Sequence, residues 1–66
     1  MTIQLNGEAF DVHGPVTISA LLEHLQIDAR RVAVEHNLTV VKRDAYSRIT
    51  INAGDHVEVV NFVGGG

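Results

Sequence analysis

A single segment of this 66-residue chain has helical periodicity, and segments with strand-like alternation lie on both sides of it. Its apolar residues recur at i, i+3, i+4 and i+7, as Ile18, Leu21, Leu22 and Leu25. This spacing places side chains on one face of an amphipathic helix that should end near Gln26. Thr17 precedes the helix and can cap it by accepting a backbone hydrogen bond. One helix among strands favours a two-layer fold, with the helix covering one face of a sheet.

The N-terminal segment predicts a β-hairpin. Residues 1–5 and 8–12 both alternate between apolar and polar side chains, and Asn6-Gly7 separates them. Asn-Gly is the strongest short hairpin signal, because a type I′ turn needs positive φ at both positions.

Four further strand-like segments follow the helix, at residues 32–35, 38–41, 49–51 and 57–63. We expect turns at His36-Asn37 and at residues 52–55, and Tyr46 as the anchor of the polar stretch 42–47. The connection through the helix is long enough to permit parallel pairing in the sheet. These elements predict an α+β fold, a β-grasp domain in which a mixed sheet of four to five strands packs on one main helix. A different α+β arrangement of the same elements is the alternative.

Composition and charge argue against several classes of partner. The net charge is −3, with five basic and eight acidic residues, whereas nucleic-acid binding normally needs a basic face. No apolar run approaches the roughly 20 residues that span a bilayer, and residues 1–5 do not resemble a signal peptide. The absence of cysteine excludes disulfides and is compatible with a reducing compartment. We expect a cytoplasmic, monomeric protein that binds neither nucleic acid nor membrane.

The residues that usually carry chemistry form no recognisable site. No two of the four histidines have the i, i+2 or i, i+4 spacing of a ready-made metal site; they are His13, His24, His36 and His56. A domain of this size also has no room for a deep catalytic cleft, since it buries only about 60% of the surface of its unfolded chain. We therefore expect no bound metal or cofactor and a protein that is not itself an enzyme.

Three consecutive glycines directly follow the last predicted strand. We expect residues 1–63 to form the folded domain and residues 64–66 a flexible glycine tail, because glycine packs no side chain and loses the most backbone entropy on ordering. One interpretation of such a segment is a frayed terminus without a function. A tail without side chains can also thread a narrow channel and bring a terminal carboxylate to a catalytic centre in another protein.

The stretch from Asn52 to Gly66 combines a Gly54-Asp55 turn, a hydrophobic last strand and a diglycine end. Together with residues 5–8, 34–37 and 41–46, it resembles the ThiS family, the sulfur carriers of thiamine (thiazole) biosynthesis. The resemblance covers essentially the whole chain. The third glycine departs from the terminal Gly-Gly by which the family is usually described, and it is compatible with that pattern.

The resemblance implies a ubiquitin-like β-grasp fold and a role as a protein cosubstrate. An E1-like (ThiF-like) adenylyltransferase would use ATP to adenylylate the carboxylate of Gly66, and a persulfide sulfur donor would convert it to a thiocarboxylate. Thiazole synthase (ThiG-like) would then take the sulfur. Gly66 is the implied point of sulfur attachment, and Gly64 and Gly65 give the tail its access. ATP is used by the partner, so this chain binds no cofactor and supplies no catalytic side chain.

We expect the folded domain, rather than the tail, to provide the surface that docks onto these partners. Val60 and Phe62 point to the opposite side of the last strand from Val57 and Val59, and an apolar patch beside the tail would suit a transient interface. The alternative is that Phe62 closes the edge of the core. Two other functions also remain open: a sulfur carrier of another pathway, like the small subunit of molybdopterin synthase, and a ubiquitin-like binding module or modifier.

Overall fold

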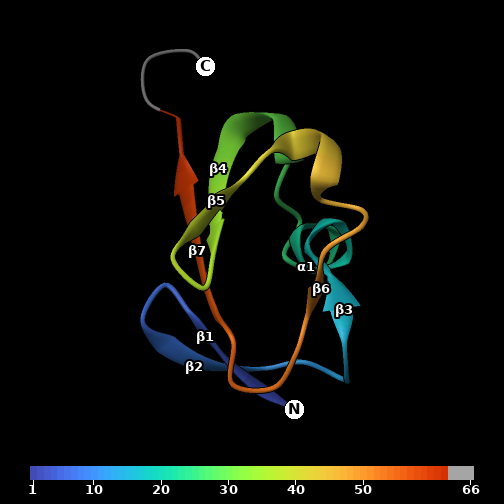
Figure 1. Ribbon diagram of the computed structural model, residues 1–66, viewed down its shortest axis with the longest axis vertical. Helices are drawn as coiled ribbons and strands as arrows, with labels where there is room; N and C mark the ends of the chain where they lie inside the picture. Colours follow the sequence, from blue (N-terminus) through green and yellow to red (C-terminus); the bar gives the residue numbers. More distant parts are fainter. Residues whose placement is uncertain (63–66) are drawn as a thin grey trace.

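Two layers make up the computed structural model, a five-stranded sheet and, against one face of it, the helix α1 with its neighbouring segments (Figure 1). The structure describes residues 1–62, so Val63 of the predicted last strand and the predicted tail, Gly64 to Gly66, lie outside the described residues. The elements, with η for a 3₁₀ turn, are β1 (Thr2–Leu5), β2 (Glu8–Asp11), β3 (Val16–Thr17), α1 (Ile18–His24), η1 (Ala29–Arg31), β4 (Val32–His36), β5 (Thr39–Val41), η2 (Arg43–Ala45), β6 (Thr50–Ile51) and β7 (His56–Asn61).

The N-terminal hairpin is the one that the sequence predicts. β1 and β2 pair antiparallel, with Ile3 opposite Phe10. Asn6 and Gly7 have φ angles of 51° and 83°, as a type I′ turn requires. The turn therefore fixes the register that turns Ile3 into the core.

The helix α1 also forms where its pattern predicts. The side-chain oxygen of Thr17 accepts a hydrogen bond of 3.0 Å from the backbone N–H of Ala20, which caps the first turn. The apolar stripe is buried at Ile18, Leu21 and Leu22. α1 ends at His24, and Gln26 then turns the chain away with a φ of 60°. Such a left-handed residue just past the last turn is a common way to end a helix.

β7 lies in the middle of the sheet, whose strand order is β2-β1-β7-β4-β5. It runs parallel to β1, with Gln4 opposite His56, and antiparallel to β4, with Val32 opposite Asn61. This mixed five-stranded sheet with one main helix confirms the predicted fold class. The short strands β3 and β6 pair with each other in a separate two-stranded sheet.

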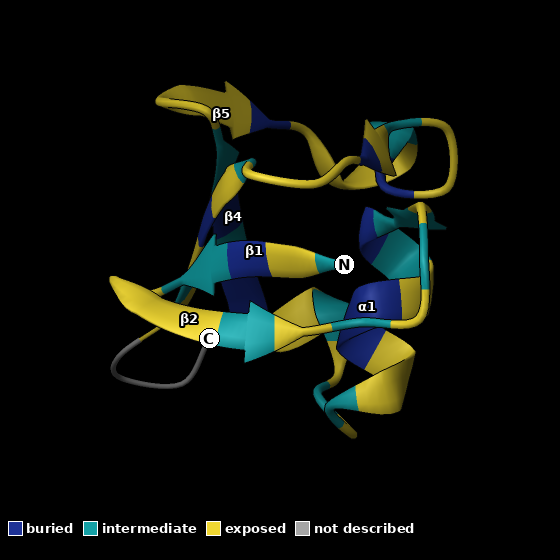
Figure 2. Cartoon of the chain, turned by 90° about the horizontal axis from the view of Figure 1, so that it is seen from below, coloured by how far each residue is buried: buried dark blue, intermediate teal, exposed yellow. Residues whose placement is uncertain are grey.

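The core lies between the two layers, and the other face of the sheet stays exposed (Figure 2). Of the described residues 1–62, ten hydrophobic ones are buried there: Ile3, Ile18, Leu21, Leu22, Val32, Val34, Val41, Tyr46, Ile51 and Val57. Tyr46 is thus the predicted anchor of the polar stretch 42–47. Among residues 1–62, no charged or polar residue other than Tyr46 is buried with them.

The turn after β4 lies one residue later than predicted. His36 ends β4, and the turn consists of Asn37 and Leu38, with φ angles of 50° and 71°. β5 accordingly begins at Thr39. A two-residue hairpin turn needs positive φ at both positions. Leucine rarely adopts it, which is why the sequence pattern assigned Leu38 to the strand.

Candidate functional site

The end of β7 is the point from which the predicted tail continues, and it is fixed to the sheet on one side. β1 pairs with β7 only as far as Leu5 opposite Val57, whereas β4 pairs with β7 up to Val32 opposite Asn61. Beyond the strand, the N–H of Phe62 still donates a 2.9 Å hydrogen bond to the carbonyl of Arg31. The chain is therefore held in a defined direction as far as Phe62.

Val60 and Phe62, the predicted docking residues, are both exposed beside this point. Their exposed fractions are 61% and 54%, while Val57 on the same strand is fully buried. The alternation of buried and exposed residues along β7 is the one that the sequence indicates. Phe62 belongs to no buried cluster, so it does not close the edge of the core.

Val40 and Leu38 are two further exposed apolar residues, and sequence reasoning did not single them out. Val40 of β5 is 69% exposed and lies opposite Glu35 of β4, which in turn lies opposite Glu58 of β7. Leu38, in the turn, is 88% exposed. Val40 and Val41 are both apolar, so the sequence does not say which of them faces outward until the register of β5 is known.

A shallow depression of about 170 Å³ lies on the sheet beside Leu38, lined by Gln4, Gly7, Glu35, Leu38, His56, Val57 and Glu58. Glu35 and Glu58 stand directly opposite each other on neighbouring strands. Two carboxylates in this position repel each other, so the depression favours a cationic group over an anionic one.

A larger hollow of about 420 Å³ is lined by residues of α1 and of the segment that follows β2. Figure 1 shows α1 away from the tip of β7. His13 and His24 line it with Asp11 and Glu23. Within residues 1–62, no group of three or more His, Cys, Asp or Glu side chains is placed to hold a metal ion. The part of the chain that the structure describes also contains no helix long and apolar enough to cross a membrane.

The histidine at the end of β4 has a structural partner. Nε2 of His36 lies 2.7 Å from Oδ2 of Asp55, and the same oxygen accepts a 2.9 Å hydrogen bond from the backbone N–H of Asn52. These contacts, above all the one from Asn52, hold the pKa of Asp55 below its ordinary value of 3.8. The network joins the turn before β7 to the end of β4.

The family model described as the ThiS family matches residues 3–66 of the chain. The chain belongs to the ThiS family. Among its relatives is the sulfur carrier protein ThiS of Bacillus subtilis, 34% identical over 65 residues that make up 97% of this chain and 98% of that protein. The crystal structure of the thiamine biosynthesis protein (ThiS) from Geobacter metallireducens superposes with a TM-score of 0.88 at 36% identity, covering both chains completely. The fold is thus the β-grasp of ThiS, and the family is one of sulfur carriers in thiamine biosynthesis.

Two relatives of this chain are much longer. It is 42% identical to a thiazole synthase of Paramagnetospirillum magneticum and 41% identical to one of Magnetococcus marinus, over all 66 residues in both cases. The chain spans about a fifth of the length of these relatives, 20% of each. A ThiS-like sequence and a thiazole synthase therefore share one polypeptide in those two proteins.

Proposed function

We propose that this chain carries sulfur as a thiocarboxylate on Gly66 and delivers it for thiazole formation. The observation that carries the proposal is the match to the ThiS family along residues 3–66, diglycine included. The geometry at Phe62 supports it, because the hydrogen bond from the Phe62 N–H to the carbonyl of Arg31, just before β4, holds the chain to the folded domain as far as Phe62. Glycines without side chains suit passage through a narrow channel.

The proposed chemistry begins by activating an unreactive carboxylate. An oxygen of the Gly66 carboxylate attacks the α-phosphorus of ATP, pyrophosphate leaves, and an acyl-adenylate forms. The terminal sulfur of a persulfide donor then attacks the carbonyl carbon and AMP leaves. A thiol then attacks the donor's sulfur atom in the resulting acyl disulfide and breaks the sulfur–sulfur bond, which yields a disulfide between the thiol and the donor and leaves the thiocarboxylate on Gly66. Partner enzymes supply every catalytic group, so the chain is a cosubstrate.

Three partners follow from this chemistry: an E1-like adenylyltransferase that uses ATP, a persulfide donor, and a thiazole synthase that accepts the sulfur. The two long relatives support the last of these, since they unite a similar sequence with a thiazole synthase. We place the docking surface at Val60 and Phe62, which are exposed next to the end of β7. Gly64 and Gly65 provide the reach from there to the active site.

Intact-protein mass spectrometry tests the proposal directly. The chain is incubated with ATP, an E1-like adenylyltransferase of a ThiS system and a persulfide donor. We expect a mass gain equal to the replacement of one oxygen by sulfur, and fragmentation should map it to Gly66. The product should then support thiazole formation when added to thiazole synthase.

Two variants make the result specific. Deletion of Gly66 should abolish the mass gain, whereas His24→Ala, on the exposed side of α1, should leave it unchanged. No mass gain from the wild-type chain, with the adenylyltransferase shown to be active on another carrier, contradicts the proposal and favours a binding module. A modified chain that fails to supply thiazole synthase points to a carrier of another pathway.

A further inference from the structure

The charges of this chain are segregated along its sequence. All five basic residues lie between positions 30 and 48; they are Arg30, Arg31, Lys42, Arg43 and Arg48. Only Glu35 and Asp44 oppose them within that stretch, which therefore has a net charge of +3. The remaining six acidic residues lie in segments without any Lys or Arg, which have a net charge of −6. Although the overall charge is −3, residues 30–48 therefore form a basic region.

The fold brings most of this basic region to the end of the sheet from which the tail continues. β4 runs antiparallel to both of its neighbours, with Val32 opposite Asn61 and Val34 opposite Val41. The start of β4 and the ends of β5 and β7 therefore share one end of the sheet. Arg31 directly precedes β4, and Lys42 and Arg43 directly follow β5. The turns η1 and η2 accordingly lie at the same end of the molecule as the tip of β7 (Figure 1).

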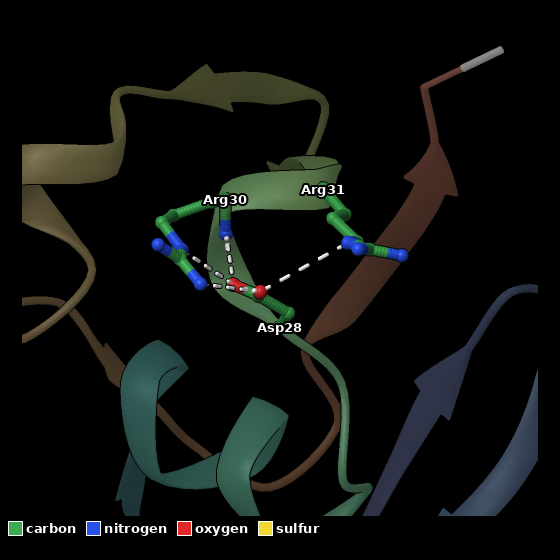
Figure 3. Close-up of polar contacts among 3 residues, drawn as sticks. All are labelled: Asp28, Arg30 and Arg31. Atoms are coloured by element: carbon green, nitrogen blue, oxygen red, sulfur yellow. Dashed lines mark hydrogen bonds and ion pairs between the residues drawn. The ribbon is translucent and has the colours of Figure 1, made fainter. Parts of the chain in front are cut away.

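Asp28 neutralises one of these cations much more than the others. Its carboxylate binds Arg30 through two guanidinium contacts of 3.1 and 3.0 Å, while the Arg31 guanidinium is 4.0 Å away and 80% exposed (Figure 3). The hydrogen bonds from Arg30 lower the pKa of Asp28 from 3.8 to about 2. Within residues 1–62, the structure records no ion pair for Lys42 or Arg43.

The length of the tail brings these residues close to any enzyme that acts on Gly66. Gly66 lies four residues beyond Phe62 in the sequence, and four extended residues span at most about 14 Å. An active site that holds Gly66 must therefore have its entrance within that distance of Phe62. The carbonyl of Arg31 accepts a hydrogen bond from the backbone N–H of Phe62. The rim of that entrance therefore faces the basic end.

We propose that Arg31, Lys42 and Arg43 dock against a rim of carboxylates around the tail channel of the enzyme that adenylylates Gly66. This rests on the proposed function. We choose the adenylylating enzyme because in the proposed chemistry it is the first enzyme to bind Gly66, and carboxylates on its rim would be complementary to the exposed cations of the basic end. The acidic remainder of the chain is then repelled by the rim, which orients the encounter before any contact forms.

Charge reversal with a matched control tests this proposal. Arg31→Glu, Lys42→Glu and Arg43→Glu are made singly and together. The rate of Gly66 adenylylation is measured as the rate of pyrophosphate release. Arg48→Glu is the control: it changes the net charge equally but lies beside the start of α1, where the N–H of Ile18 donates to the Ile49 carbonyl at 3.1 Å. Circular dichroism and thermal unfolding verify that each variant is folded.

Each single reversal at the basic end should raise KM roughly 2- to 5-fold with kcat unchanged, and the triple variant should raise it more than about 10-fold. Arg48→Glu should stay within about 2-fold of wild type. Raising the ionic strength should reduce the difference between the triple variant and wild type, because exposed charges are screened.

Four results would overturn the proposal: KM values no higher than that of Arg48→Glu, a loss confined to kcat, a difference that salt does not reduce, or a defect only with thiazole synthase. A wild-type chain that is not adenylylated at all refutes the proposed function instead. The two failures are therefore distinguishable.

Discussion

The side-chain oxygen of Asn6 accepts a 2.8 Å hydrogen bond from the backbone N–H of Val59, although 53 residues separate the two in sequence. β1 stops pairing with β7 at Leu5 opposite Val57, and the Asn6 side chain satisfies the next donor along β7. The same residue closes the first hairpin at a φ of 51°. One asparagine thus serves both the N-terminal turn and the strand that leads to the tail.

We expect Asn6→Gly to lower the free energy of unfolding by about 1 kcal/mol, because glycine keeps the turn but removes the acceptor. Asn6→Asp retains an acceptor at this position and tolerates the left-handed backbone, so it should lie within about 0.5 kcal/mol of wild type. Urea denaturation of the three proteins measures the difference. Equal losses in both variants would show that the hydrogen bond to Val59 contributes nothing to stability.

Leu38→Gly should stabilise the protein by about 0.5–1 kcal/mol. Leu38 has a φ of 71° and is 88% exposed, so glycine relieves the backbone strain without removing a core contact. Thr39→Gly, one residue into β5, is the control and should destabilise instead. Thermal unfolding compares the two, and a destabilised Leu38→Gly would contradict the assigned turn.

Phe62→Ala should leave stability within about 0.5 kcal/mol of wild type while raising KM for Gly66 adenylylation, because Phe62 is exposed and belongs to no buried cluster. Val57→Ala, on the same strand but fully buried, should instead cost about 2 kcal/mol of stability. Urea titrations and steady-state kinetics on both variants separate docking from packing. An unchanged KM for Phe62→Ala would remove this residue from the docking surface.

The pKa of Asp55 predicts part of the acid sensitivity of the protein. It is lower in the folded state than the ordinary value of 3.8, so the stabilisation from Asp55 is complete above that value and is lost as the pH falls through the lower folded pKa. Asp55→Asn should therefore lose stability less steeply than wild type below about pH 4. Asp44→Asn, in the exposed turn η2, is the control for the removal of one surface carboxylate. Urea midpoints across this pH range give the comparison.

Local patterns in the sequence predict much of this fold. Asn6-Gly7 specifies the first hairpin, the stripe from Ile18 to Leu25 specifies α1, and the alternation along β7 places Val60 on the exposed face. These features depend on neighbours within a few residues, where turn chemistry and periodicity are decisive. The predicted docking residues could be located for the same reason.

Long-range pairing and its consequences were not predictable in this way. No local pattern states that β7 lies between β1 and β4, or that β3 and β6 form their own sheet. In the sequence, Arg30-Arg31 and Lys42-Arg43 are two separate pairs, and no local pattern connects them. Only the antiparallel pairing of β4 with both β5 and β7 brings Arg31 and Lys42 to the end of the sheet near Phe62.

The central position of β7 also has a consequence for biosynthesis. β7 lies between the β1–β2 hairpin and the β4–β5 hairpin and pairs with both β1 and β4. The two hairpins therefore cannot become one sheet before residue 61 has left the ribosome. The non-local pairing of β1 with β7 makes this a late and slow step of folding. A nascent chain, or one truncated before β7, therefore lacks the complete five-stranded sheet. An enzyme that requires the folded surface would therefore accept the chain only after its synthesis has passed residue 61.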